Sequence, residues 1–128
     1  MTVSGVTIDA ADPEKLAAWW AEALGWRLDG TLCHSPTGGL QRLEFMAVPE
    51  AKRVKNRVHI DFGADDVQAA VDRLVAMGAT IAWEEEFPPE LHYRNLVLRD
   101  PEGNEFCVGG SVGAQPPRDP ESADWRLT

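Results

Sequence analysis

Two similar four-residue segments carry the side chains of this chain that most resemble a chemical site. Val58-His59-Ile60-Asp61 looks like a second copy of Val6-Thr7-Ile8-Asp9, 52 residues earlier. An imidazole and carboxylates at such spacing could bind a metal ion or transfer a proton. The first copy has threonine where the second has histidine, so the contribution of His59 depends on the side chains that the fold brings to it.

The surroundings of both segments indicate a repeated strand–helix unit. An amphipathic helical pattern follows each segment, and a glycine, Gly25 or Gly78, closes each helix. Asp12 before a proline predicts the start of the first helix, and either Asp65 or Asp66 can cap the second.

Short extended segments follow each helix, so the sequence predicts a βαβββ module written twice. The modules cover about residues 3–50 and 56–109 and form a single domain over residues 1–110. In the second module, residues 80–83 are expected as a short strand and the acidic run 84–86 as a solvated loop. Residues 111–128 are expected as a surface or partly disordered tail, because their composition shifts to glycine, proline and charge.

Composition excludes several classes of protein. The net charge of −9 argues against a nucleic-acid or anionic-membrane surface, because both require a basic footprint. No apolar run approaches the roughly 20 residues of a membrane-spanning helix. The first residues do not resemble a signal peptide, and Cys33 and Cys107 form no CxxC motif, so a reduced cytoplasm is expected.

Three segments resemble a known family. They are the opening residues 8–20, the 58–61 strand with its helix, and the turn Asp100-Pro101-Glu102-Gly103-Asn104-Glu105-Phe106. Together they resemble a glyoxalase-like domain of the vicinal oxygen chelate superfamily, over residues 3 to about 109.

The resemblance implies an α+β fold. Two βαβββ modules would form a curved mixed sheet around a pocket, with helices on the outer face. Members of the superfamily commonly form two-fold dimers. Some hold one divalent cation on the first and fourth strands of each module, whereas others bind bulky antibiotics without metal.

Strand alternation predicts which side chains face the pocket. Val58, Ile60 and Phe62 are expected to face the helix. The opposite side would then carry the predicted pocket residues Thr7, Asp9, Glu44, Met46, His59, Asp61, Glu105 and Cys107.

Only some of the family's metal-ligand positions carry a suitable residue in this sequence. His59 falls on the expected histidine position and Glu44 on the fourth strand. The first-strand position falls on Gly5 or Thr7, neither of which is a good ligand, and the last-strand glutamate falls on Cys107.

No metal cofactor is favoured, because a catalytic zinc site needs about three protein ligands. The remaining histidines, His34 and His92, are expected in loops. The alternative is an altered site formed by His59, Glu44 and Cys107, which could hold zinc, nickel, manganese or iron.

The predicted function is binding of a small organic molecule in the paired-module pocket, as in bleomycin-resistance proteins, without the usual metal site. The alternative is a metal-dependent lyase or isomerase of the glyoxalase type. No catalytic residue is assigned. The expected protein is a cytoplasmic homodimer with a small-molecule ligand and no nucleic-acid or membrane partner.

Overall fold

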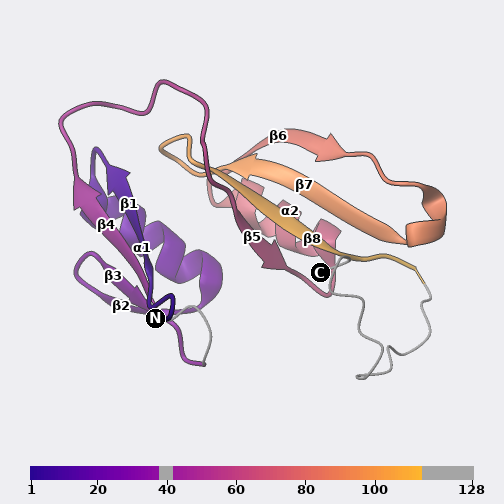
Figure 1. The fold of residues 1–128 in the computed structure, drawn as a ribbon, viewed down its shortest axis with the longest axis horizontal. Coiled ribbons are helices and arrows are strands. Elements are labelled where there is room, and N and C mark those ends of the chain that lie inside the picture. Colours follow the sequence, from indigo (N-terminus) through magenta and orange to yellow (C-terminus); the bar gives the residue numbers. More distant parts are fainter. Residues whose placement is uncertain (38–41, 114–128) are drawn as a thin grey trace. The chain divides into compact units, whose positions relative to one another are not determined.

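The computed structural model describes residues 1–37 and 42–113 (Figure 1). The chain forms two compact units, of which the first spans Met1–Val54 and the second begins at Lys55. Each unit is a βαβββ module, so the predicted α+β fold with a repeated module is confirmed.

The first module has a four-stranded mixed sheet and one helix. Its elements are β1 (Val6–Ala10), α1 (Pro13–Leu24), β2 (Arg27–Asp29), β3 (Leu32–His34) and β4 (Arg42–Ala47). The strand order is β1-β4-β3-β2, with β1 parallel to β4 and the other pairs antiparallel. His34, expected in a loop, is the last residue of β3, because it pairs with strand residues on both sides.

Helix α1 begins and ends where its sequence predicts. The Asp12 carboxylate accepts a hydrogen bond from the Lys15 backbone N–H at 3.2 Å, and Pro13 occupies the first helical position. Gly25 ends the helix in the left-handed conformation, with φ of 67°. The buried face of the helix is formed by Leu16, Ala17, Trp20 and Ala21.

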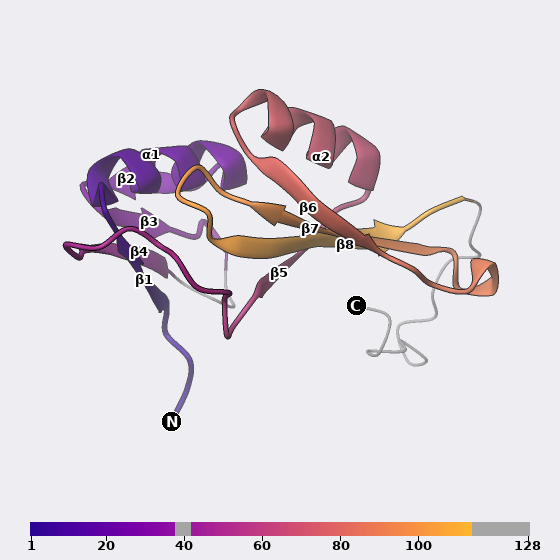
Figure 2. The ribbon, with the colours of Figure 1, turned by 90° about the horizontal axis from the view of Figure 1, so that it is seen from above.

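The second module repeats this order. Its elements are β5 (Ile60–Gly63), α2 (Val67–Ala76), β6 (Thr80–Glu85), a short 3-10 helix (Pro89–Leu91), β7 (Tyr93–Arg99) and β8 (Glu105–Ser111). The strand order is β5-β8-β7-β6, and β5 is parallel to β8. Figure 2 shows that in each module the helix covers one face of the sheet.

Asp66 is the residue that caps α2. Its carboxylate accepts from the Ala69 backbone N–H at 3.0 Å, which decides between the two predicted caps. Val67, Val71 and Leu74 then form the buried face of the helix.

Two further predictions, both on the ends of strands, were wrong. Strand β5 begins at Ile60 rather than Val58, because its ladder with β8 starts at the Ile60–Phe106 pair, and Val58 is 74% exposed. Glu84 belongs to β6 and not to a loop, because β7 extends far enough to pair with it.

The tail begins later than expected, since Ser111 belongs to β8 and the Val112 backbone N–H donates to the His92 carbonyl at 2.8 Å. Residues 114–128 of the predicted tail lie outside the described residues. Among the described residues, no helix has both the length and the apolar character needed to cross a membrane.

Candidate functional site

In the second module, the β8 glycines show which face of the sheet the helix covers. A Cβ atom added to Gly110 would lie 3.1 Å from the Val67 Cγ2 atom of α2. Val108 and Phe106, two and four residues earlier, therefore face the helix. Glu105 and Cys107 point the other way, onto what we call the helix-free face of the second module.

His59 stands between these two side chains. Its Nδ1 atom lies 3.7 Å from the Cys107 sulfur, and its Nε2 atom lies 4.0 Å from Oε2 of Glu105. Asp61 is the cross-strand partner of Cys107. The structure thus brings together the four predicted pocket residues of this module.

The carboxylate of Glu105 is already paired. Its side chain is only 3% exposed, and the Lys55 ammonium lies 3.2 and 3.3 Å from its two oxygens. Burial alone would raise the pKa of Glu105, but the hydrogen bond and charge of Lys55 outweigh burial and lower that pKa. Asn56 holds the approach to β5 by donating to the backbone carbonyls of Glu105 and Val58.

The thiol of Cys107 is held in its neutral form. Burial is the main cause that raises its pKa from 9.0 to about 11, and the carboxylate of Asp61 adds to the shift. A hydrogen bond from Asn95 opposes the shift without cancelling it. At neutral pH and without a bound metal ion, this thiol is therefore a poor nucleophile, since that role needs the thiolate.

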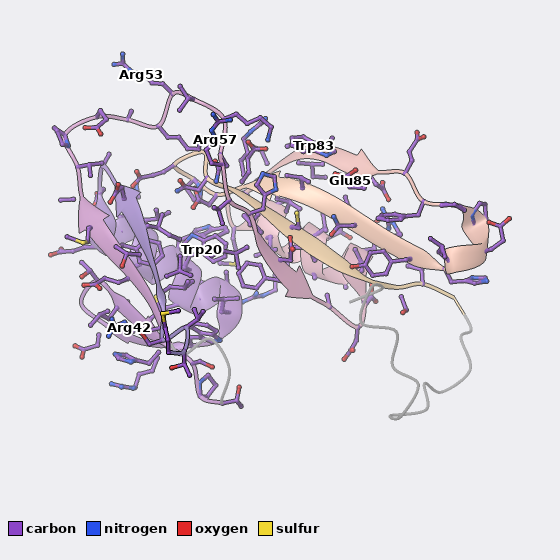
Figure 3. The ribbon with its side chains drawn as sticks, in the orientation of Figure 1. Trp20, Arg42, Arg53, Arg57, Trp83 and Glu85 are labelled. Carbon is purple, nitrogen blue, oxygen red and sulfur yellow. The ribbon has the colours of Figure 1, made fainter. Side chains whose placement is uncertain are left out.

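Trp83 adds an aromatic surface to the same face. Trp83 on β6 pairs with Val97 on β7, and Val97 pairs with Cys107 on β8. The three side chains therefore lie in one row on the same face of the sheet. The indole N–H donates to Glu85 at 2.9 Å, and the Lys55 ammonium lies 4.9 Å from the ring centroid (Figure 3).

Sequence reasoning missed Lys55, Trp83 and Asn95. For Trp83 a signal existed, because Trp83 and Glu85 alternate in the way that strand residues on one face do. No pattern indicates Lys55, which comes before β5 and meets Glu105 across 50 residues.

In the first module, Cys33 identifies the helix-covered face. Its thiol donates to the Ala17 carbonyl of α1 at 3.2 Å, and its cross-strand partner Leu43 is fully buried. The neighbours of Leu43 along β4 and their β1 partners therefore point away from α1. This helix-free face of the first module carries Thr7, Asp9, Glu44 and Met46.

A cationic side chain covers the first-strand position expected for a metal ligand. A Cβ atom added to Gly5 would lie 2.5 Å from Cγ and 3.0 Å from Nε of Arg42. The Arg42 side chain therefore lies across Gly5, in the space that a ligand side chain at this position would need.

Within each module taken by itself, the donor atoms do not complete the metal site implied by the resemblance. Among the residues that the structure describes, no group of three or more His, Cys, Asp or Glu side chains is placed to hold an ion. In the second module His59 has only a protonated thiol and an already paired carboxylate beside it. Glu44 belongs to the first module, where Gly5 offers no ligand.

Comparison with protein families places the chain. Residues 5–109 match the model of the glyoxalase-like domain. The chain belongs to this family, and thereby to the vicinal oxygen chelate superfamily. The comparison with curated proteins found no match.

Solved structures with the same fold come from several bacteria. A glyoxalase/bleomycin resistance protein/dioxygenase family enzyme from Burkholderia phytofirmans PsJN shares 20% identity, with 88% of this chain and 100% of that chain covered and a TM-score of 0.67. A fosfomycin resistance protein from Listeria monocytogenes, complexed with Mn(II) and 1S,2S-dihydroxypropylphosphonic acid, shares 17% identity over 88% and 90% of the two chains, with a TM-score of 0.67.

A lactoylglutathione lyase from Agrobacterium tumefaciens shares 22% identity over 85% of this chain and 92% of that chain, with a TM-score of 0.57. Identities this low show a common fold, whereas function follows from the site.

Proposed function

We propose that the protein binds a small organic molecule on the helix-free face of its second module, without a bound metal ion. The observation that carries this proposal is the pairing of Lys55 with Glu105. The carboxylate nearest to His59 is buried and already neutralised by a fixed ammonium. An incoming divalent cation would have to displace Lys55 and would meet a protonated thiol at Cys107.

The side chains around this ion pair support binding of an organic ligand. Small-molecule sites combine apolar or aromatic surface with a few fixed polar groups. Trp83 supplies the aromatic surface, and the His59 ring lies 6.4 Å from it between centroids. Asn95 and Glu85, which pair with each other across β6 and β7, add polar groups to the same face.

One observation favours the alternative, a metal-dependent lyase or isomerase that uses His59, Glu44 and Cys107. The 3.7 Å between the His59 nitrogen and the Cys107 sulfur is close to the separation, about 3.6 Å, of a nitrogen and a sulfur ligand on one tetrahedral zinc ion. That site would require ionisation of a thiol whose pKa is about 11.

Metal analysis separates the two functions. Protein purified without chelator should contain much less than one equivalent of zinc, nickel, manganese or iron by plasma mass spectrometry. Chelator and added metal should leave its melting temperature unchanged. One equivalent of metal that is lost in His59→Ala but retained in His92→Ala would overturn the metal-free proposal.

Ligand binding is then tested with a library of small aromatic and heteroaromatic compounds, scored by thermal shift. Compounds that stabilise the wild-type protein should stabilise Trp83→Leu much less, because stacking on the indole is lost. The matched control is Trp19→Leu, which changes a tryptophan of the first module. Equal losses in both variants would contradict the assignment of Trp83 to the site.

A further inference from the structure

Basic side chains form a row across three adjacent strands of the first module. Arg27 on β2 pairs with His34 on β3, and His34 pairs with Arg42 on β4. His34 is one residue from the helix-facing Cys33, so the row lies on the helix-free face. Cations opposite one another on a sheet destabilise it unless a negative charge lies near them.

Arg42, labelled in Figure 3, is the member of this row on β4. Its side chain lies across the backbone at Gly5, just before β1, because Gly5 has no Cβ atom to exclude it. Gly5 does not have a positive φ, so its backbone conformation does not require glycine. What glycine contributes here is the space that its missing side chain leaves for Arg42. Within residues 1–37 and 42–113, the Arg42 guanidinium has no hydrogen-bond or ion-pair partner.

The absence of a carboxylate partner is informative in a chain with 21 acidic residues and a net charge of −9. Asp29 and Glu44 lie one row further along the same face, both paired with Leu32. Neither forms an ion pair with Arg42. A guanidinium that is charged at all accessible pH values thus keeps its donors available.

We propose that Arg42 forms an oxyanion site on the helix-free face of the first module, which binds a phosphate, phosphonate or carboxylate group of a small molecule. The planar guanidinium donates two parallel hydrogen bonds to such a group. Arg27 adds a second positive charge to the same row. This assignment names the charge of the group bound at the first module, and it goes beyond the proposed function, which concerns the second module.

Other basic residues are less suited to this role. The segment before β5 contains Lys52, Arg53, Lys55 and Arg57. Lys55 is held by Glu105, and Lys52 donates to the Val54 carbonyl. Arg57 is exposed and stands outside any strand, which makes it a matched control for loss of one positive charge.

The test is an NMR titration of the full chain with methylphosphonate, inorganic phosphate and acetate at low ionic strength. Signals of the Gly5 amide and the Arg42 Nε–H group should shift and saturate. Arg42→Gln should raise the apparent Kd about tenfold or more, the loss expected for charge-assisted hydrogen bonds. Arg57→Gln should change the Kd less than about twofold, because an exposed charge that does not contact the anion is screened.

Gly5→Ala tests the geometry without any change of charge. The new Cβ would displace the Arg42 side chain, so the Kd should rise several-fold although every cation remains. Arg42→Lys should bind more weakly than wild type, because it keeps the charge and loses the planar fork. Circular dichroism of each variant establishes that the fold is retained.

The three titrations distinguish the anions. Tighter binding of methylphosphonate and phosphate than of acetate assigns a phosphorus oxyanion. Tighter binding of acetate assigns a carboxylate. Equal losses in Arg42→Gln and Arg57→Gln, or shifts that do not saturate with any anion, would overturn the proposal. Neither of these two outcomes would change the conclusion that is drawn from the metal content of the protein. Conversely, one equivalent of bound metal with Arg42-dependent anion binding would overturn the proposed function alone.

Discussion

Two ionisable side chains on the helix-free face of the second module are each held in one protonation state by their surroundings. Cys107 is kept protonated by burial and by Asp61, and Glu105 is kept ionised but paired with Lys55. Both states follow from contacts with neighbours, and each gives a measurable prediction.

Alkylation of Cys107 should be slow at pH 8 and should accelerate up to about pH 11. With a pKa of about 11, only about one thiol in a thousand is ionised at pH 8. Asp61→Asn should speed alkylation by iodoacetamide, because it removes a charge that opposes the thiolate. Peptide mass spectrometry over time measures the rate, and Asp9→Asn in the other module is the control. A rapid reaction in the wild-type protein at pH 8 would contradict the assignment of a neutral thiol.

Lys55→Met should lower the free energy of unfolding at pH 7 by about 1–3 kcal/mol, since it leaves a buried carboxylate unpaired. The low end is expected because the Lys55 side chain is 64% exposed. Urea denaturation of both proteins at equal concentration measures the difference.

The difference should depend on pH in a defined direction. The pKa of Glu105 is lowered in the folded protein, so the ion pair contributes fully above the ordinary value of 4.5 and is lost as the pH falls through the folded value. Lys55→Met and wild type should therefore converge in acid. A difference that persists there, or that equals the effect of Lys15→Met, would indicate lost packing instead of a lost ion pair.

At the scale of secondary-structure elements, the two helices begin at aspartates that their sequences mark in advance. Asp12 and Asp66 each accept a backbone N–H three residues later. The strands are then ordered by pairing across the sheet, which extends β6 to Glu85 and starts β5 at Ile60. Arg94 ties β7 to β6 and to α2, through Glu84 at 2.7 Å and Gln68 at 2.9 Å.

Asp66→Ala should destabilise the protein by about 1 kcal/mol, the usual cost of losing a helix cap. Asp65→Ala is the matched control, because the preceding aspartate does not cap the helix, and its effect should stay below about 0.5 kcal/mol. Thermal and urea unfolding measure both variants. Equal effects would mean that the cap is shared between the two carboxylates.

At the scale of the whole molecule, two modules of the same topology each bury their own set of apolar side chains. The largest fully buried ones include Leu16, Leu43 and Phe45 in the first module and Val67, Val71 and Leu98 in the second. Exposed apolar side chains such as Val58, Ile81 and Met46 leave surface available for association.

We expect a two-fold homodimer, the commonest symmetric assembly. Light scattering coupled to size exclusion should give a mass of twice 14.1 kDa. On dilution, the measured mass should fall toward that of a single chain only at the lowest protein concentrations. A mass of 14.1 kDa at all concentrations would contradict this expectation.

The sequence alone determined the repeated βαβββ order, the α1 cap at Asp12 and the family. These features depend on local signals: a capping carboxylate acts within one helical turn, and strand alternation has a period of two. Alternation also assigned Thr7 and Glu44 to one face of the first sheet, where the structure pairs them.

Only the tertiary structure decided what surrounds those side chains. Lys55 meets Glu105 across 50 residues, and Arg42 lies over Gly5, which precedes it by a whole helix and three strands. No local pattern encodes such contacts, because they form only when the sheet aligns distant segments. For the same reason, sequence identified His59 as a candidate ligand but could not show that its neighbours are a protonated thiol and a paired carboxylate.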